Sequence, residues 1–259
     1  MPGLRCAVWL GHAPAAPRPA VDGALLDGTE RARAHRIADP AARAHYIAAR
    51  AGIRRTLGAA LGTAPERLAW GRTPCPGCGS ERHGPPVLLG QERRLWLSVS
   101  RSGPWWLLAL SHAGPVGVDV EAAGDAPGGG VGPAVLRRCF SAAERERIAG
   151  LPAAWRQREA LRGWVRKEAV GKVLGTGTAA GLHAIEVLAG AWPAGHRTGT
   201  VRPPGGSRWP VAELPLGRAL VAAVAGPGHG GDAADGHGNA AGGHGGHGGD
   251  TAPVGTART

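Results

Sequence analysis

The chain has 259 residues, of which 43% are hydrophobic, so its length allows one large domain or two small ones. Its formal net charge of +11 at pH 7 favours a polyanionic partner, although an arginine-rich background alone would also produce that charge. Four cysteines are too few for a disulfide framework, and neither an apolar leader nor a run of about 18 apolar residues is present, so a cytoplasmic protein is expected.

The N-terminal part is expected to hold one strand and a helical stretch. Residues 7–10 (AVWL) form a short apolar run that is typical of a strand, and a proline-rich connector follows. From residue 25 to residue 61 the apolar spacing turns helical. Asp39 followed by Pro40 predicts the start of a helix, and Gly62 predicts its end.

Residues 74–87 form a loop rich in proline and glycine that carries two cysteines. Cys75 and Cys78 have the spacing of a zinc knuckle, and His83 supplies a third possible ligand. A structural zinc site usually has four ligands, so a turn with small buried thiols is the alternative. Both interpretations stay open at this point.

Three strands are expected in the middle of the chain. Residues 95–100 and 105–110 are apolar runs joined by a turn, and residues 116–121 alternate apolar and acidic positions. This alternation places Asp119 and Glu121 on one face of the third strand, with valines facing the core. Two carboxylates side by side repel each other, and a divalent cation between them would relieve that repulsion.

Two helices are predicted after the third strand. Residues 133–149 read as helical with a break near Ser141, because Ser141 and Glu144 have the spacing of a capping box. A longer helix is expected over residues 153–174, where glycines end it.

The longer helix contains the only two lysines of the chain, Lys167 and Lys172. Trp164, Glu168 and Lys172 fall at i, i+4 and i+8, so they share one helix face. Glu followed by Lys at this spacing is also an ordinary stabilising pair worth about 0.2–0.5 kcal/mol. The acidic pair on the preceding strand favours a functional role instead.

The C-terminal part is expected to be short strands followed by a disordered tail. Residues 185–188 and 220–224 are strand candidates, with a proline-rich connection between them. From Gly226 onward, Gly, His, Ala and Asp dominate without apolar periodicity, which predicts disorder.

Three motifs carry a family resemblance: GVDVE at residues 117–121, FSAAE at 140–144, and WVRKEAVGK at 164–172 followed by GTG. In this order and spacing they strongly resemble the 4'-phosphopantetheinyl transferases of the surfactin-synthetase-activating type, over roughly residues 25 to 225. The resemblance implies an α+β fold of two similar halves related by a pseudo-twofold. The halves would be residues 1–112 and 113–225, with residues 226–259 as the tail.

The resemblance also implies an activity. Such an enzyme, of the holo-[acyl-carrier-protein] synthase type, transfers the 4'-phosphopantetheine arm of coenzyme A to a serine of an apo acyl, aryl or peptidyl carrier protein and releases 3',5'-ADP. It would serve fatty acid, polyketide or nonribosomal peptide biosynthesis as a cytoplasmic monomer, without nucleic acid or membrane as partner. Mg2+ would be held by Asp119, Glu121 and Glu168.

Residue roles follow from the same resemblance. Glu168 would take the proton of the carrier serine, directly or through a water, and Lys172 would lie beside the reacting phosphate. The residues expected to bind coenzyme A are Arg50, Arg54, Ser100, Arg101 and Lys167. Arg101 stands where the family usually has a histidine, and residues 84–86 (GPP) replace a Gly-Lys/Arg-Pro turn.

Two other functions fit parts of the pattern. A metal-dependent nuclease combines carboxylates, a lysine and a basic surface, but the chain shows no interleaving of aromatic and basic residues for base stacking. A catalytically weak relative that only binds carrier proteins would explain the two departures from the family pattern. Incubation with labelled coenzyme A, Mg2+ and an apo carrier protein separates the three functions.

Overall fold

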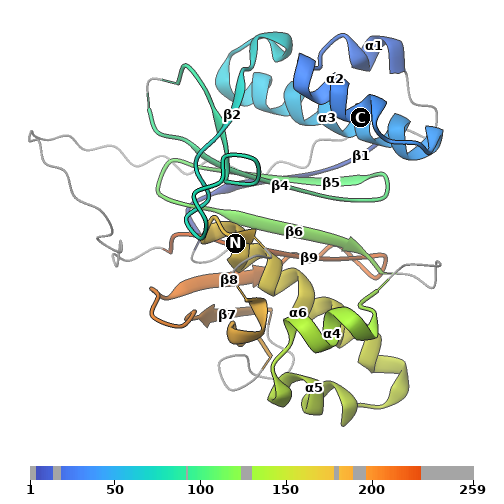
Figure 1. The fold of residues 1–259 in the computed structure, drawn as a ribbon, viewed down its shortest axis with the longest axis vertical. Helices are drawn as coiled ribbons and strands as arrows, with labels where there is room; N and C mark the ends of the chain where they lie inside the picture. The colour runs from blue at the N-terminus through green and yellow to red at the C-terminus, as the bar shows by residue number, and fades with distance from the viewer. Residues whose placement is uncertain are drawn as a thin grey trace, which may run out of the picture.

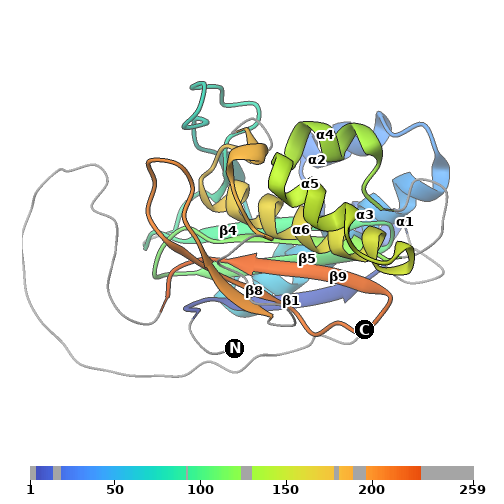
Figure 2. The same cartoon turned by 90° about the horizontal axis from the view of Figure 1, so that it is seen from below.

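The computed structural model describes residues 4–13, 19–91, 93–123, 130–177, 181–188 and 197–228. Figures 1 and 2 show two sheets stacked between two long helices, α3 on one side and α6 on the other. This mixed architecture of helices and antiparallel sheets agrees with the expected fold class, and the pseudo-twofold relation between halves stays a prediction. Within the described ranges, no helix combines the length and apolar character needed to cross a membrane.

The N-terminal elements build the first sheet and its helical cover. The sheet has the antiparallel order β1-β5-β4, formed by β1 (Ala7–His12), β4 (Trp96–Ser102) and β5 (Trp105–Ser111). Three helices precede β4, namely α1 (Pro19–Gly23), α2 (Gly28–His35) and α3 (Pro40–Leu61). The short hairpin of β2 (Trp70–Arg72) and β3 (Pro86–Leu88) follows α3 and a 3-10 turn, Pro65–Arg67. Ile53 and Leu57 of α3 pack against Leu108 of the sheet.

The C-terminal elements build the second sheet, with the antiparallel order β6-β9-β8-β7. Its strands are β6 (Gly117–Ala122), β7 (Thr198–Val201), β8 (Trp209–Glu213) and β9 (Leu220–Ala225). The helices are α4 (Pro133–Cys139), α5 (Ala142–Ala149) and α6 (Ala153–Val173), followed by a 3-10 turn, η3 (Leu182–Ala184). Val165 and Ala169 of α6 pack against Ala223 of β9.

Local capping chemistry sets the helix boundaries that the sequence predicts. Asp39 caps α3 by accepting a hydrogen bond from the amide of Ala42, and Gly62 ends this helix in the left-handed conformation with φ of 64°. Ser141 and Glu144 form the predicted capping box at the start of α5. The predicted break between α4 and α5 is therefore confirmed.

The core between the two sheets confirms the face assignment of β6. Val118 and Val120 are fully buried and pack with Leu107 of β5 and Val224 of β9. The alternating side chains of β6, Asp119 among them, consequently point away from this core.

Two predictions about the C-terminal part are wrong. Residues 185–188 do not form a strand; they follow η3, and their apolar side chains are buried as a loop that covers the core around α6. The proline-rich connection contains the β7-β8 hairpin instead.

The predicted tail starts too early. Leu4 forms a β-bridge with Gly228, and the amide of Arg5 donates a hydrogen bond to the carbonyl of Pro227 at 2.9 Å. Residues 226–228 are thus part of the fold, and residues 229–259 lie outside the described residues.

Candidate functional site

A close backbone contact brings helix α6 onto strand β6. A Cβ atom at Gly117 would lie 1.9 Å from the carbonyl oxygen of Ala169 and 2.8 Å from the amide nitrogen of Val173. Only glycine fits this position, because any side chain would push the helix off the strand. Glu168 and Lys172 each directly precede one of these two contacting residues, so the contact places them next to the acidic face of β6.

Lys172 links the two elements directly. Its ammonium Nζ donates to Asp119 Oδ1 at 2.7 Å and to the carbonyl oxygen of Val118 at 2.8 Å. An ammonium has three N–H donors, so these two contacts leave the third for another acceptor. The predicted neighbourhood of Lys172 and the acidic strand is therefore present.

Asp119 is buried and only half satisfied. Its Oδ1 accepts hydrogen bonds from Lys172 and from Ser100 Oγ, the latter at 2.6 Å. Its Oδ2 is buried without a hydrogen-bond partner among the described residues. A buried carboxylate oxygen without a donor is costly, and such an oxygen is a suitable ligand for a cation.

Glu121, two residues further along β6, is held by donors from two other elements. Ser102 Oγ on β4 donates to Glu121 Oε2 at 2.8 Å, and Trp164 Nε1 on α6 donates to Glu121 Oε1 at 3.4 Å. Burial raises the pKa of Glu121, and the neighbouring charge of Asp119 raises it further. The carboxylate of Glu121 is therefore fixed in position, while burial and the charge of Asp119 disfavour its ionised form.

Glu168 completes the acidic group from the side of α6. Burial raises the pKa of Glu168 to about 7, with the charges of Asp119 and Glu121 adding to the rise and that of Lys172 opposing it. A carboxylate with a pKa near neutrality exists in both protonation states under physiological conditions. This is the property expected of a general base or acid.

Asp119, Glu121 and Glu168 offer the oxygen ligands that a divalent ion prefers, although their carboxylates are too far apart in this structure to contact one ion together. Oxygen atoms of Asp119, Glu121 and Glu168 do not all lie within 4.8 Å of each other, a criterion that only Cys75, Cys78 and His83 meet among the described residues. Mutual repulsion contributes to the raised pKa values of Glu121 and Glu168, and a cation would relieve it. Three carboxylates, one of them with a buried oxygen that lacks a donor, are the ligand chemistry that Mg2+ prefers.

Serines on β4 position this acidic group. Ser100 and Ser102 bond the side chains of Asp119 and Glu121, and Ser98 Oγ accepts the amide of Val118 at 3.1 Å. Ser100 was predicted to bind coenzyme A, but the structure shows its hydroxyl proton committed to Asp119. Ser102 and Trp164 were not predicted as site residues. The alternation of serines at 98, 100 and 102 was the available signal.

Lys167 does not lie at this site, which corrects its predicted role in binding coenzyme A. Its ammonium is fully buried on another face of α6, forms an ion pair with Glu144 at 2.7 Å and donates to the carbonyl oxygen of Leu182 at 3.0 Å. Consecutive helical residues point about 100° apart, so Lys167 cannot share the face of Glu168. Lys167 instead ties α5 and η3 to α6.

Arg54 is also structural rather than exposed to a ligand. Its guanidinium is completely buried, with ion pairs to Asp27 and Glu30 at 2.7 Å each and hydrogen bonds to two backbone carbonyls at 2.9 Å. These contacts anchor α2 to α3. The prediction that Arg54 binds phosphate is therefore wrong for this arrangement.

Four arginines do gather near the first sheet: Arg33, Arg50, Arg72 and Arg101. The guanidinium carbons of Arg33 and Arg101 lie 6.0 Å and 4.9 Å from the ring centre of Tyr46, and that of Arg50 lies 4.4 Å from the ring of Trp70. Arg50 also pairs with Glu30.

Electrostatics within these four arginines favour an anionic ligand. Burial lowers the pKa values of Arg72 and Arg101, and the charges of Arg33 and Arg50 lower both further. Like charges at close range are stabilised by an anion such as phosphate. Arg50 and Arg101 were predicted as phosphate ligands, whereas Arg33 and Arg72 were missed because nothing in their local sequence sets them apart from the other arginines.

One hollow of about 410 Å³ lies elsewhere, along the first half of α6. Trp155, Arg158, Arg162 and Glu213 are among its lining residues, and the carboxylates of β6 are not. The candidate site is therefore defined by converging charges rather than by this hollow.

Comparisons with known proteins agree on one family. The family model described as 4'-phosphopantetheinyl transferase superfamily matches residues 115–225, a segment that contains both β6 and α6. HetI of Nostoc sp. (strain PCC 7120 / SAG 25.82 / UTEX 2576), named a 4'-phosphopantetheinyl transferase, is 30% identical over 213 residues, 80% of this chain and 81% of HetI. The protein slr0495 of Synechocystis sp. (strain ATCC 27184 / PCC 6803 / Kazusa), named "Putative 4'-phosphopantetheinyl transferase slr0495", is 29% identical over 171 residues. That match covers 65% of each chain, just under two thirds of slr0495.

Proposed function

Because the chain belongs to the 4'-phosphopantetheinyl transferase superfamily, we propose that it transfers the 4'-phosphopantetheine arm of coenzyme A to a serine of an apo acyl, aryl or peptidyl carrier protein. The serine oxygen forms a new bond to the β-phosphorus of coenzyme A, and the bond from that phosphorus to 3',5'-ADP breaks. This is the holo-[acyl-carrier-protein] synthase reaction, and we place it in the cytoplasm on a monomeric enzyme.

One observation carries the proposal: the buried Oδ2 of Asp119 has no partner within the described structure, on a strand where two further carboxylates converge. The matched family segment contains all three of these acids. Mg2+ bound by Asp119, Glu121 and Glu168 would neutralise charge on the pyrophosphate of coenzyme A.

Lys172 supplies a fixed positive charge at the reacting phosphate. Its contacts with Asp119 and the carbonyl of Val118 hold the ammonium in place and leave one N–H donor for a phosphate oxygen. A preorganised charge of this kind stabilises the negative charge that develops on the leaving group.

Glu168 is the best candidate for the general base. In the Mg2+-loaded enzyme the neighbouring cation lowers the pKa of Glu168 below its metal-free value of about 7, so that the carboxylate is ionised and can accept the proton of the serine hydroxyl, directly or through a water. The proton thus moves from the serine oxygen to Glu168 as the new phosphorus–oxygen bond forms.

The arginines around Tyr46 are proposed to bind the remaining phosphate groups of coenzyme A. Arg101 lies between Ser100 and Ser102 on β4, but its side chain points to the opposite face of the strand, toward Tyr46 of α3, whereas the two serines contact the acidic group. The high net charge of +11 also suits an acidic carrier protein as partner.

A mass-spectrometric assay tests the proposal. The protein is incubated with coenzyme A, Mg2+ and apo carrier proteins of the fatty acid, polyketide and nonribosomal peptide classes, and a phosphopantetheine mass gain is expected on at least one. Asp119→Asn, which keeps the side-chain shape but removes the charge, should abolish the gain. Carrier binding without any mass gain would overturn transfer and identify a catalytically weak relative instead.

A further inference from the structure

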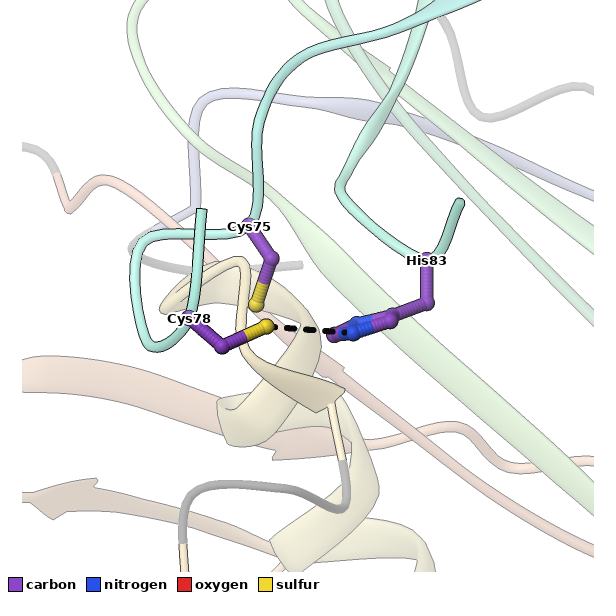
Figure 3. A group of neighbouring side chains, drawn as sticks. All are labelled: Cys75, Cys78 and His83. Carbon is purple, nitrogen blue, oxygen red and sulfur yellow. Dashed lines mark hydrogen bonds between the residues drawn. The ribbon is translucent and has the colours of Figure 1, made fainter. Parts of the chain in front are cut away.

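The loop between β2 and β3 brings three metal-binding side chains together, away from the acidic site. Ligand atoms of Cys75, Cys78 and His83 all lie within 4.8 Å of one another, and Cys78 Sγ is 3.2 Å from His83 Nε2. Figure 3 shows the two thiols side by side and turned toward the imidazole.

These separations lie close to those of a tetrahedral zinc centre, with the contact between Cys78 and His83 somewhat shorter. With Zn–S bonds of about 2.3 Å and Zn–N bonds of about 2.1 Å, neighbouring ligand atoms lie ~3.6–3.8 Å apart. Small shifts of three side chains would therefore complete the geometry. Cys78 and His83 are exposed, so a water can fill the fourth position.

A tight turn follows Cys75 and brings Cys78 back beside it. The amide of Gly79 donates to the carbonyl of Cys75 at 2.7 Å, and Gly79 has φ of 72°, so the chain turns tightly behind the pair of cysteines.

The rest of the loop is tied into a fixed shape. The amide of Cys75 donates to the carbonyl of Ser80, the amide of Thr73 to that of Pro85, and Arg72 Nη1 to that of Gly84 at 2.6 Å. His83 is thereby presented to the thiols by a loop that is closed on both sides, which lowers the entropy lost when a ligand binds.

The loop also touches the end of the helix that carries Glu168 and Lys172. A Cβ atom at Gly175 would lie 2.8 Å from Pro85 Cγ and 3.1 Å from Pro76 Cγ, and the amide of Gly175 donates to the carbonyl of Lys172 at 3.1 Å. Pro76 and Pro85 of the loop thus pack against the turn that ends α6.

We propose that Cys75, Cys78 and His83 bind one Zn2+ ion, with water as the fourth ligand, and that this ion fastens the β2–β3 loop against the end of α6. Two sulfur ligands and one imidazole favour Zn2+ over Mg2+, so this site is chemically separate from the carboxylates. The ion stabilises the fold and takes no part in phosphoryl transfer.

Zinc content tests the site on the full chain. The wild type is purified in a phosphine reductant, dialysed against metal-free buffer and measured by mass spectrometry of the metal. The wild type should hold one equivalent of zinc more than Cys78→Ser, whose exposed position tolerates serine. Cys6→Ser is the control: Cys6 lies far from the loop in the sequence, so this variant should hold as much zinc as the wild type. Four histidines after residue 228 are present in every variant, so their contribution cancels.

Cobalt substitution identifies the ligands. Co2+ added to the metal-free wild type should give a thiolate-to-metal charge-transfer band in the near ultraviolet, which Cys75→Ser and Cys78→Ser each weaken and His83→Ala shifts. A chelator should lower the melting temperature of the wild type and of Cys6→Ser but not that of Cys78→Ser. Equal zinc content in the wild type and Cys78→Ser, or no thiolate band in the wild type, would overturn the proposal whether or not the transferase assay succeeds.

Discussion

Replacing Glu168 by Gln should stabilise the metal-free protein, and increasingly so as the pH rises. In the folded protein the pKa of this buried carboxyl rises from an ordinary value of 4.5 to about 7. The folded state then binds more protons than the unfolded state between these values, so stability falls as the pH increases through this window. At about 1.4 kcal/mol per pH unit, ionised Glu168 costs about 3 kcal/mol above pH 7.

Urea unfolding in chelator at pH 5 and at pH 8 measures this cost. The free energy of unfolding of Glu168→Gln should exceed that of the wild type by less than 1 kcal/mol at pH 5, where the folded carboxyl is mostly protonated, and by about 3 kcal/mol at pH 8. The exposed Glu146 on α5 offers a matched control, and Glu146→Gln should show no such growth.

Mg2+ should reverse the difference, because an ion bound only by the folded state stabilises it. The wild type at pH 8 is expected to gain stability with Mg2+, and Glu168→Gln to gain less. A stability difference between the two proteins that does not change from pH 5 to pH 8 would refute the argument that Glu168 is buried beside Asp119.

Three further perturbations test other parts of the site. Lys172→Ala should lower kcat roughly 10- to 1000-fold with a modest change in KM, and Lys172→Arg should rescue poorly because a planar fork does not replace a compact ammonium; a fully active arginine variant would contradict this. Arg101→Ala should raise the KM for coenzyme A far more than that for the carrier, and Arg101→His should recover much of the loss, whereas unchanged coenzyme A kinetics would place the side chain outside the binding surface. Lys167→Met should destabilise the protein by about 3–5 kcal/mol in urea unfolding, because it leaves the buried carboxylate of Glu144 without its cationic partner. The double variant with Glu144→Gln should recover part of that loss. An unaltered urea midpoint for the single variant would show that the ion pair is not buried.

The sequence by itself determined the parts of the molecule that depend on local chemistry. Capping at Asp39 and Ser141 set helix ends, and period-two alternation placed Asp119 and Glu121 on one face of β6. The i, i+4, i+8 spacing aligned Trp164, Glu168 and Lys172 on one face of α6. These features depend only on a few neighbouring residues, so they can be predicted before any tertiary contact is known.

Only the tertiary structure decided which charged residues are available to a ligand. Arg54 and Lys167 have the same charge as Arg101 and Lys172, yet the first two are consumed by buried ion pairs with Glu30 and Glu144. Glu30 and Glu144 lie more than twenty residues away in the chain from the basic residues that they pair with, so the sequence around Arg54 or Lys167 does not predict these ion pairs.

The same holds for the apolar loop and for the cysteine loop. Residues 185–188 look like a strand because burial selects apolar side chains whether the backbone is paired or irregular. His83 and the two cysteines could be judged as metal ligands only once the β2–β3 loop had closed and brought them within 4.8 Å. Sequence patterns report periodicity and burial, whereas partners distant in the chain meet only through the packing of the two sheets and their helices.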